Sequence, residues 1–292
     1  MKFAYLIIAH NEPLLFEILL RLLDDERNDI YVHIDKKTDI SQFDKFKLKY
    51  SNLIFINRIP VYWGDESQIQ VELNLLQAAH SHGGYDYYHL LSGVDLPLKS
   101  QNFIHRFFEE HAGTEFVGIT HSDFNLNDLK HKTAYYYFFT KYYRSIGWKA
   151  WFLRKISNLL IMLQSTFKVE RRYDVSLSKG PNWFSISDLL CQYILNRKEI
   201  ILDRFKYVLC PDEMFLQTEI MNSYFQNNIY DSEDQFEACM REIDWKRGNP
   251  YVWRNNDVNE LKKSNRLFAR KFSTKYMSVV NEIIDYISSC DK

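Results

Sequence analysis

One carboxylate in this sequence is placed where it could act as a general base. Pro211-Asp212-Glu213 precedes a helical pattern over residues 214–223. Proline suits the first turn of a helix and acidic side chains favour its positive end, so these residues could simply cap the helix. Alternatively, Glu213 could take a proton from a hydroxyl group, which requires one carboxylate within hydrogen-bond reach. The sequence by itself fits both interpretations.

A second carboxylate follows a predicted strand. Residues 87–91 are aromatic and apolar, the run ends at Ser92-Gly93, and Asp95 comes two residues later. Pro97 is then expected to stop the strand. Open α/β sheets bind ligands beyond the carboxyl ends of their strands, which makes Asp95 a candidate ligand-binding residue. An aspartate that caps a turn explains the pattern equally well.

The composition limits the class of protein. The chain has 292 residues and a formal net charge of -1, which argues against bulk binding of nucleic acid. Its four cysteines show no CxxC spacing and indicate a reducing compartment. The N-terminus lacks the long apolar region of a secretory signal, and no run approaches the ~20 apolar residues of a membrane span. We therefore expect a cytoplasmic protein, soluble or peripheral to the inner face of a membrane.

Strand and helix patterns alternate through the first 120 residues, which predicts an α/β fold with a doubly wound, mostly parallel sheet. Strands are expected at 3–9, 30–34, 53–56, 87–91, 115–118 and 182–186, and helices at 14–23, 65–79, 103–111, 187–195 and 214–223. An aromatic and basic insertion interrupts this alternation at about 121–178. Because there is no linker or repeat, we expect one domain over 1–292 with a C-terminal extension.

Seven blocks of the sequence resemble, in order, those of the core-2/I-branching glycosyltransferases, which include β-1,6-N-acetylglucosaminyltransferases and peptide O-xylosyltransferases. The resemblance runs from residue 3 to 272. The blocks are Ala4-Tyr5-Leu6-Ile7-Ile8-Ala9-His10, Tyr31-Val32-His33-Ile34-Asp35-Lys36-Lys37, Trp63-Gly64-Asp65-Glu66-Ser67, Ser92-Gly93-Val94-Asp95-Leu96-Pro97-Leu98-Lys99, Lys179-Gly180-Pro181-Asn182-Trp183-Phe184, Pro211-Asp212-Glu213 and Leu267-Phe268-Ala269-Arg270-Lys271-Phe272.

The resemblance implies a GT-A-like fold, an inverting mechanism, a nucleotide-sugar donor and no metal cofactor. It assigns the catalytic base to Glu213 and neutralisation of the donor diphosphate to Lys271, with Arg270 beside it and Arg247 as a less direct match. This diphosphate-binding segment spans about 240–275. Asp35 becomes a candidate for contact with the nucleoside, together with His10 and Asp95.

The chemistry of the reaction agrees with this assignment. The negative charge that develops on the leaving diphosphate must be stabilised by a metal ion or by fixed cations. The Ser92–Asp95 turn offers one carboxylate where metal-dependent GT-A enzymes usually carry an Asp-x-Asp pair. Arg266, Arg270 and Lys271 provide a cationic substitute, although a solvated basic face explains them as well.

Several other candidate side chains could have a structural role instead of binding a substrate. His10 and His33, at strand ends, could approach the nucleotide or be hydrogen-bonded within the fold. Trp183 could stack on an acceptor sugar, with Asp212 nearby, or lie in the core. Asp65 and Glu66 are better explained as a helix cap and a first-turn acid.

We therefore expect an inverting, metal-independent transferase that moves a sugar from a UDP-sugar to a hydroxyl of a glycan acceptor. GlcNAc is the first choice of donor sugar and xylose the second. The alternative from a different class is a non-catalytic carbohydrate- or nucleotide-binding protein on the same scaffold. A Rossmann-type oxidoreductase is set aside, because no Gly-x-Gly-x-x-Gly follows the first strand.

The segment 141–172 carries eight basic side chains and one acidic one, a formal charge of +7, interleaved with tryptophan and leucine. Such a pattern suits a helix that lies on an anionic membrane, close to a lipid-linked glycan acceptor. The alternative is a helical lid over the acceptor cleft whose apolar face packs on the core.

Overall fold

The central feature of the fold is a six-stranded sheet with the order β3-β2-β1-β4-β7-β6. The computed structural model describes residues 1–290. The four strands from β3 to β4 run parallel, and β7 and β6 add an antiparallel edge. The strands are β1 Phe3–Ala9, β2 Asn28–Ile34, β3 Asn52–Phe55, β4 Tyr87–Ser92, β6 Phe116–Val117 and β7 Phe184–Ser187. The predicted α/β fold with a mainly parallel sheet is confirmed.

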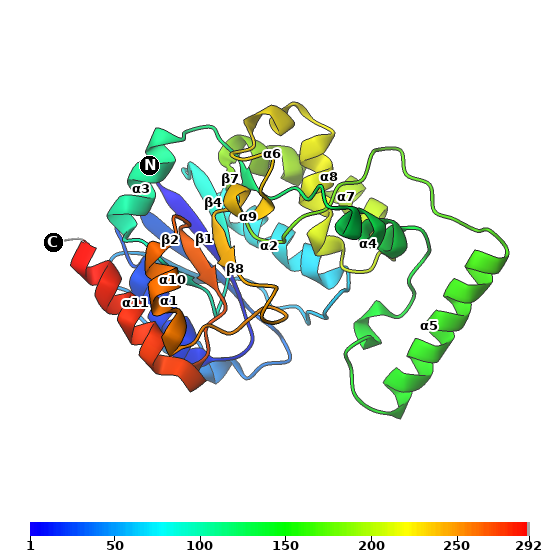
Figure 1. Cartoon of the computed structure of the whole chain (residues 1–292), viewed down its shortest axis with the longest axis horizontal. Coiled ribbons are helices and arrows are strands. Elements are labelled where there is room, and N and C mark those ends of the chain that lie inside the picture. Colours follow the sequence, from blue (N-terminus) through cyan, green and yellow to red (C-terminus); the bar gives the residue numbers. More distant parts are fainter. Residues whose placement is uncertain (291–292) are drawn as a thin grey trace.

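Helices cover both faces of this sheet (Figure 1). One apolar cluster contains residues of α1, α3 and α11, and a second contains residues of α2, α6, α7 and α8. The continuous apolar runs of β1 and β4 are buried because they face both clusters. The helices are α1 Pro13–Leu23, α2 Ser67–His82, α3 Gln101–Glu110, α4 Asp123–Thr133, α5 Trp148–Thr166, α6 Asp188–Asn196, α7 Lys198–Phe205, α8 Phe215–Met221, α9 Gln235–Ala238, α10 Val258–Lys263 and α11 Met277–Cys290.

A second, three-stranded sheet with the order β5-β9-β8 was not expected. Its strands are β5 Leu96–Pro97, β8 Arg241–Ile243 and β9 Phe268–Arg270. Pro97 therefore does not simply end a strand, since it pairs with Phe268 after the chain has left β4. The buried Arg241 donates hydrogen bonds to the carbonyl oxygens of Leu90 and Phe184, which fastens the small sheet to the large one. The segment at 240–275 is thereby held against the end of β4.

The carboxyl ends of β1, β2 and β4 lie together. The amide of Asp35 donates to the carbonyl of Ala9 at 3.0 Å, and the amide of Gly93 donates to that of Ile8 at 3.0 Å. A Cβ at Gly93 would stand 2.7 Å from the Cβ of Ala9, so only glycine allows this approach. The residues that follow these three strands, His10, Asp35 and Asp95, are thus gathered at one edge, as parallel topology predicts.

The predicted insertion contains α4, the short 3-10 turn η2 Thr140–Tyr142 and α5. Figure 1 shows α5 at the side of the molecule, joined by extended segments and set apart from the main sheet. Its buried residues are Ala150 and Ser157. Its apolar side chains are divided between two sides: Leu153, Leu160 and Ile161 are partly buried, whereas Trp148, Trp151 and Leu159 are exposed. The lid and the membrane interpretations both stay predictions. Within residues 1–290, none of the helices has the length and apolar character needed to cross a bilayer.

Candidate active site

Three of the sequence blocks meet at the turn that carries Glu213. Pro211–Glu213 forms a 3-10 turn, η3, before α8. The amide of Gly180 donates to the carbonyl of Glu213 at 2.9 Å, and the amide of Cys210 donates to the carbonyl of Gly64 at 3.0 Å. A Cβ at Gly180 would stand 1.9 Å from the carbonyl oxygen of Gly118, so a larger residue would push the segment that contains Gly180 away from the one that contains Gly118.

Glu213 belongs to a ring of four charged side chains. Its Oε2 lies 3.0 Å from Nζ of Lys132 and 3.2 Å from Nζ of Lys179, and both ammonium groups lie 2.8 Å from Oδ2 of Asp128. The side chain of Glu213 is 32% exposed. Although burial lowers the pKa of Lys132, the Glu213 carboxylate raises it above its ordinary value. The contacts use Oε2, and among residues 1–290 no hydrogen-bond donor reaches Oε1.

Asp128, Lys132 and Lys179 are site residues that the sequence analysis did not identify. Lys179 stands in one of the family blocks, but nothing in the block indicates that it faces Glu213. Asp128 and Lys132 lie in α4, inside the insertion, four residues apart. That spacing is typical of a solvated ion pair on a helix surface. Only the fold, which brings α4 to the η3 turn, shows their place.

Beneath Glu213 lies a buried layer of polar side chains from α2. Oδ2 of Asp212 accepts a hydrogen bond from Nε2 of Gln68 at 2.8 Å, and Oδ1 of Asp212 is buried without a partner. Glu72, one helical turn after Gln68, is fully buried, and neither of its carboxyl oxygens has a partner. Burial, and next the charge of Glu213, raise the pKa of Asp212 to about 7. Burial and next the charge of Asp212 raise the pKa of Glu72 far above its ordinary value.

This burial bears on the assignment of Asp212 to the acceptor. With 7% of its surface exposed, Asp212 lies below the partly exposed carboxylate of Glu213 and contacts α2. This burial limits its predicted contact with an acceptor, and its hydrogen bond with Gln68 supports the turn instead. The Pro-Asp-Glu block thus combines a buried carboxyl group whose pKa is raised with a partly exposed carboxylate.

On the other side of the site, Asp95 holds Arg270. Oδ1 of Asp95 lies 2.8 Å from a guanidinium nitrogen of Arg270 and accepts from the Ser92 hydroxyl at 2.7 Å. Its Oδ2 accepts from the Ser92 amide at 2.8 Å. The Asp95 side chain is 3% exposed, so it lies under the site and positions the arginine. The guanidinium also stacks over the ring of Trp183 at 4.4 Å, which places Trp183 beside a predicted diphosphate-binding cation.

Lys271 lies among other charges at the edge of the sheet. Burial and next the charges of Arg270 and Arg144 lower its pKa. The pKa of His10 is lowered as well, first because surrounding protein atoms partly desolvate its ring, although one side of the residue remains exposed. The charge of Asp35 opposes this decrease, and the charges of Arg270 and Lys271 add to it. These effects indicate that Arg270, Arg144 and His10 lie near Lys271. Arg144 was not predicted; it comes from the insertion and stacks on Trp63 at 3.7 Å.

Asp35 and Arg247 occupy less direct positions. Oδ2 of Asp35 pairs with Nζ of Lys37 at 3.2 Å, and its Oδ1 accepts from the amide of Lys37 at 2.9 Å. The guanidinium of Arg247 contacts three carboxylates, those of Asp244, Asp257 and Glu260. An arginine paired in this way carries little uncompensated charge toward a diphosphate. The geometry does not favour Arg247 as the second donor cation and points to Arg270.

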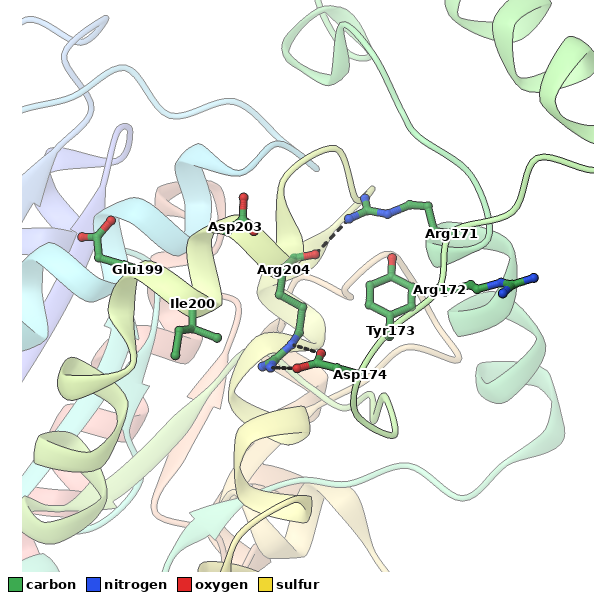
Figure 2. Close-up of a pocket in the computed structure, with 8 residues that line it drawn as sticks. All are labelled: Arg171, Arg172, Tyr173, Asp174, Glu199, Ile200, Asp203 and Arg204. Atoms are coloured by element: carbon green, nitrogen blue, oxygen red, sulfur yellow. Dashed lines mark hydrogen bonds and ion pairs between the residues drawn. The ribbon is translucent and has the colours of Figure 1, made fainter.

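A pocket of about 550 Å³ lies elsewhere, between residues 171–174 and α7 (Figure 2). Its wall contains Arg204, paired with Asp174 at 3.3 Å and also with the buried Glu219. Arg171 donates to the carbonyl oxygens of Arg204 and Lys206. Because these charges are paired, we interpret the pocket as the seam that fixes the end of the insertion to α7. The described residues hold no group of three or more His, Cys, Asp or Glu side chains arranged for a metal ion.

Comparisons with known proteins identify the family of the chain. The profile of the Core-2/I-branching enzyme family matches residues 3–265. Xylosyltransferase 2 of Homo sapiens is 20% identical over 309 residues, which cover 98% of this chain and 33% of that protein, so the chain spans about a third of its length. The crystal structure of S. aureus TarS matches 40% of this chain and 21% of its own, at 13% identity and a TM-score of 0.27, too low to support an argument. The family match confirms the resemblance seen in the sequence: the chain belongs to the Core-2/I-branching enzyme family of glycosyltransferases.

Proposed function

We propose that this protein transfers a sugar from a UDP-sugar to a hydroxyl of a glycan acceptor, with inversion at the anomeric carbon and without a divalent metal. The proposed donor sugar is GlcNAc. UDP-xylose is the alternative donor, and the similarity to a protein named xylosyltransferase keeps it in the test. Both donors leave the same UDP, so the assignment of the catalytic side chains is common to them.

The observation that carries the proposal is a five-residue segment that connects the two halves of the site. Lys179, at its start, contacts Glu213, and Trp183, at its end, lies under the guanidinium of Arg270. Four residue steps span at most about 14 Å of extended chain. The proposed base and Arg270, a proposed diphosphate-binding cation, are therefore held at the two ends of one short segment.

The reaction follows from this arrangement. The acceptor hydroxyl oxygen attacks the anomeric carbon, and its proton passes to Oε1 of Glu213. The bond between the anomeric carbon and the diphosphate oxygen breaks, and the electron pair leaves with UDP. Lys271 and Arg270 face the charge that develops on the diphosphate. Lys132 and Lys179 hold Oε2, so they orient the carboxylate while Oε1 is left to accept the proton.

Metal independence is supported by the position of Asp95. The carboxylate of Asp95, at the end of β4, accepts hydrogen bonds from Ser92 and Arg270, so it fixes the guanidinium of Arg270 in position. The positive charge that a metal ion would supply to the leaving group is present in the side chains of Arg270 and Lys271. Fixed cations of this kind stabilise a departing diphosphate by the same electrostatic effect.

The proposal is tested by Glu213→Gln, which keeps the shape of the side chain and removes its basicity. We expect the transfer rate with the best donor to fall by roughly 10²–10⁴ while donor affinity changes little. The donor is identified first by thermal shift with UDP-GlcNAc, UDP-xylose, UDP-glucose and UDP-galactose. The control is Glu233→Gln, which removes an exposed carboxylate and should retain wild-type turnover. A Glu213→Gln variant with wild-type turnover would rule out the assignment.

The same assay separates the enzyme from a non-catalytic binding protein on the same scaffold. An enzyme hydrolyses its UDP-sugar slowly when no acceptor is present, because water can replace the acceptor hydroxyl. A binding protein shows the thermal shift and releases no UDP over hours. Release of UDP by the wild type, and its loss in Glu213→Gln, is the result we expect.

A further inference from the structure

The outer face of α5 is apolar and open to solvent. We define this outer face by the side chains that lie within about one third of the helix circumference around Trp148 and that are exposed. They are Trp148, Trp151, Phe152, Lys155, Leu159, Met162, Leu163 and, in the last turn, the polar Thr166. Trp148 is 82% exposed and Trp151 57%. Contiguous exposed apolar side chains of this size mark a binding surface on a soluble domain.

The opposite face of the helix is the one that contacts the rest of the protein, and much of it is polar. Arg154 donates to the carbonyl oxygens of Tyr142, Tyr143 and Ser145. The hydroxyl of Ser157 donates to the carbonyl of Phe138 at 2.8 Å. The inner side also carries the partly buried Leu153, Leu160 and Ile161, so α5 has apolar side chains on both sides. The exposed apolar side chains of the outer side are the ones that indicate an apolar environment outside the protein.

The charge around the outer face is strongly positive. The segment 141–172 has a formal charge of +7 within a chain whose total is -1, so the remaining residues carry -8. Lys155 is exposed within the apolar face and Lys149 beside it, and the exposed Lys168 follows the end of α5. Lys155 lies 5.8 Å from the ring of Trp151, with its ammonium group able to remain in a polar layer while the ring is buried.

From these observations we propose that the outer face of α5 docks on an anionic lipid bilayer. A second copy of the chain would bring a second segment of charge +7 against the first, which electrostatic repulsion disfavours. A row of leucine and methionine is unsuited to nucleic acid. On an anionic membrane, the aromatic and aliphatic side chains of the outer face would enter the acyl layer, and the lysines beside them would contact the anionic headgroups.

Docking would also place the active site close to the membrane. Ile161, on α5, packs against a small buried cluster of Tyr137, Leu209 and Cys210, and Cys210 directly precedes the η3 turn. The arm that carries the outer face is therefore built onto the turn that carries Glu213. On the proposed function, this position favours an acceptor glycan that is attached to a lipid. This last step rests on the proposed transferase activity, whereas the docking itself does not.

The test is co-sedimentation of the full chain with vesicles of phosphatidylcholine alone and with vesicles that contain one third phosphatidylglycerol, at low and high salt. We expect binding to the anionic vesicles at low salt, partial release at high salt, and little binding to the neutral vesicles. Protein that stays in the supernatant with anionic vesicles at low salt overturns the proposal.

Two pairs of variants locate the surface. Lys149→Glu/Lys155→Glu should lower the partition coefficient at least about 30-fold, because each nearby basic residue contributes about fivefold. Lys47→Glu/Lys263→Glu makes the same change in net charge away from the insertion and should have a smaller effect. Trp148→Ser/Trp151→Ser should weaken binding at both salt concentrations, because apolar contact is insensitive to salt, and Trp245→Ser is its control.

The remaining outcomes are also decisive. Equal losses in the test and control variants would show nonspecific attraction and overturn the assignment to α5. A dimer that forms without vesicles and is lost in Trp148→Ser/Trp151→Ser would identify a second copy as the occupant. Release of UDP from the donor, measured without vesicles on Lys149→Glu/Lys155→Glu and on Trp148→Ser/Trp151→Ser, should be unchanged. Failure of docking is therefore distinguishable from failure of the proposed function.

Discussion

Two neighbouring carboxyl groups of the site differ in their exposure to solvent, and this difference has a measurable consequence. Asp212 is buried against α2, and its pKa is raised to about 7, while the partly exposed Glu213 lies between two lysines. An unfolded chain loses the Asp212 proton near pH 4. The folded protein keeps that proton up to about pH 7, so Asp212 increasingly disfavours the folded state as the pH rises between these values.

Replacing Asp212 with asparagine removes this titration. We expect Asp212→Asn to be more stable relative to wild type at pH 8 than at pH 5, with the difference in the free energy of unfolding (variant minus wild type) larger by about 2 kcal/mol at pH 8. Denaturant unfolding at the two pH values measures the difference. Asp203→Asn, which removes an exposed carboxylate, is the matched control. A difference that does not change between pH 5 and pH 8 would mean that Asp212 ionises normally in the folded protein.

At this scale, the sequence offered candidates for the reacting groups but not for their supports. Glu213, Arg270 and Lys271 lie in blocks that resemble those of the family, and their roles stay predictions. Asp128 and Lys132 could not be predicted, because the fold alone brings their helix to Glu213. Glu72 was hidden for a different reason: a glutamate in a helix is expected on its exposed face, and this one is fully buried.

At the scale of elements, two successive cations with different supports stand at the end of strand β9, Arg270 as its last residue and Lys271 directly after it. Arg270 is fixed by Asp95, whereas Lys271 makes no ion pair with any carboxylate of residues 1–290. An unpaired cation has its full charge available for a diphosphate. Arg247, in the loop after β8, has its charge met by three carboxylates. The two basic residues should therefore contribute very differently to donor binding.

The comparison of Lys271→Ala with Arg247→Ala tests this difference. We expect Lys271→Ala to raise the Kd for UDP by roughly 10- to 100-fold, as expected for a lost hydrogen bond between charged groups. Arg247→Ala should change the Kd by less than about threefold, and its effect should appear in thermal stability. Titration calorimetry with UDP measures both. A reversed order of the two effects would restore Arg247 as the donor cation.

The large elements were predictable and the small ones were not. Strands β1, β2 and β4 are apolar runs long enough to be recognised, and α1 and α2 show helical spacing. Strands β5, β8 and β9 have two or three residues each, too few for any periodicity. They exist because Arg241 and the pairing of Pro97 with Phe268 hold them in place. Such long-range contacts leave no local signal in the sequence.

At the scale of the whole molecule, the site is assembled from parts that are distant in sequence. The mainly parallel sheet supplies His10, Asp35 and Asp95, the η3 turn supplies Glu213, and the small sheet supplies the cations. The insertion adds Lys132 beside the base and Arg144 near Lys271. Positive side chains from separate segments thus surround the space where charge would develop during transfer.

This distribution of charge leads to the prediction about metal ions. Because fixed cations face the leaving diphosphate and Asp95 is occupied by Arg270, the rate of sugar transfer should be unchanged in excess EDTA. Added Mn²⁺ or Mg²⁺ should not increase it by more than about twofold. A glycosyltransferase known to need Mn²⁺, assayed in the same buffers, shows that the chelator is effective. Loss of activity in EDTA and its recovery with Mn²⁺ would contradict the prediction and would mean that Arg270 and Lys271 do not suffice to stabilise the leaving group.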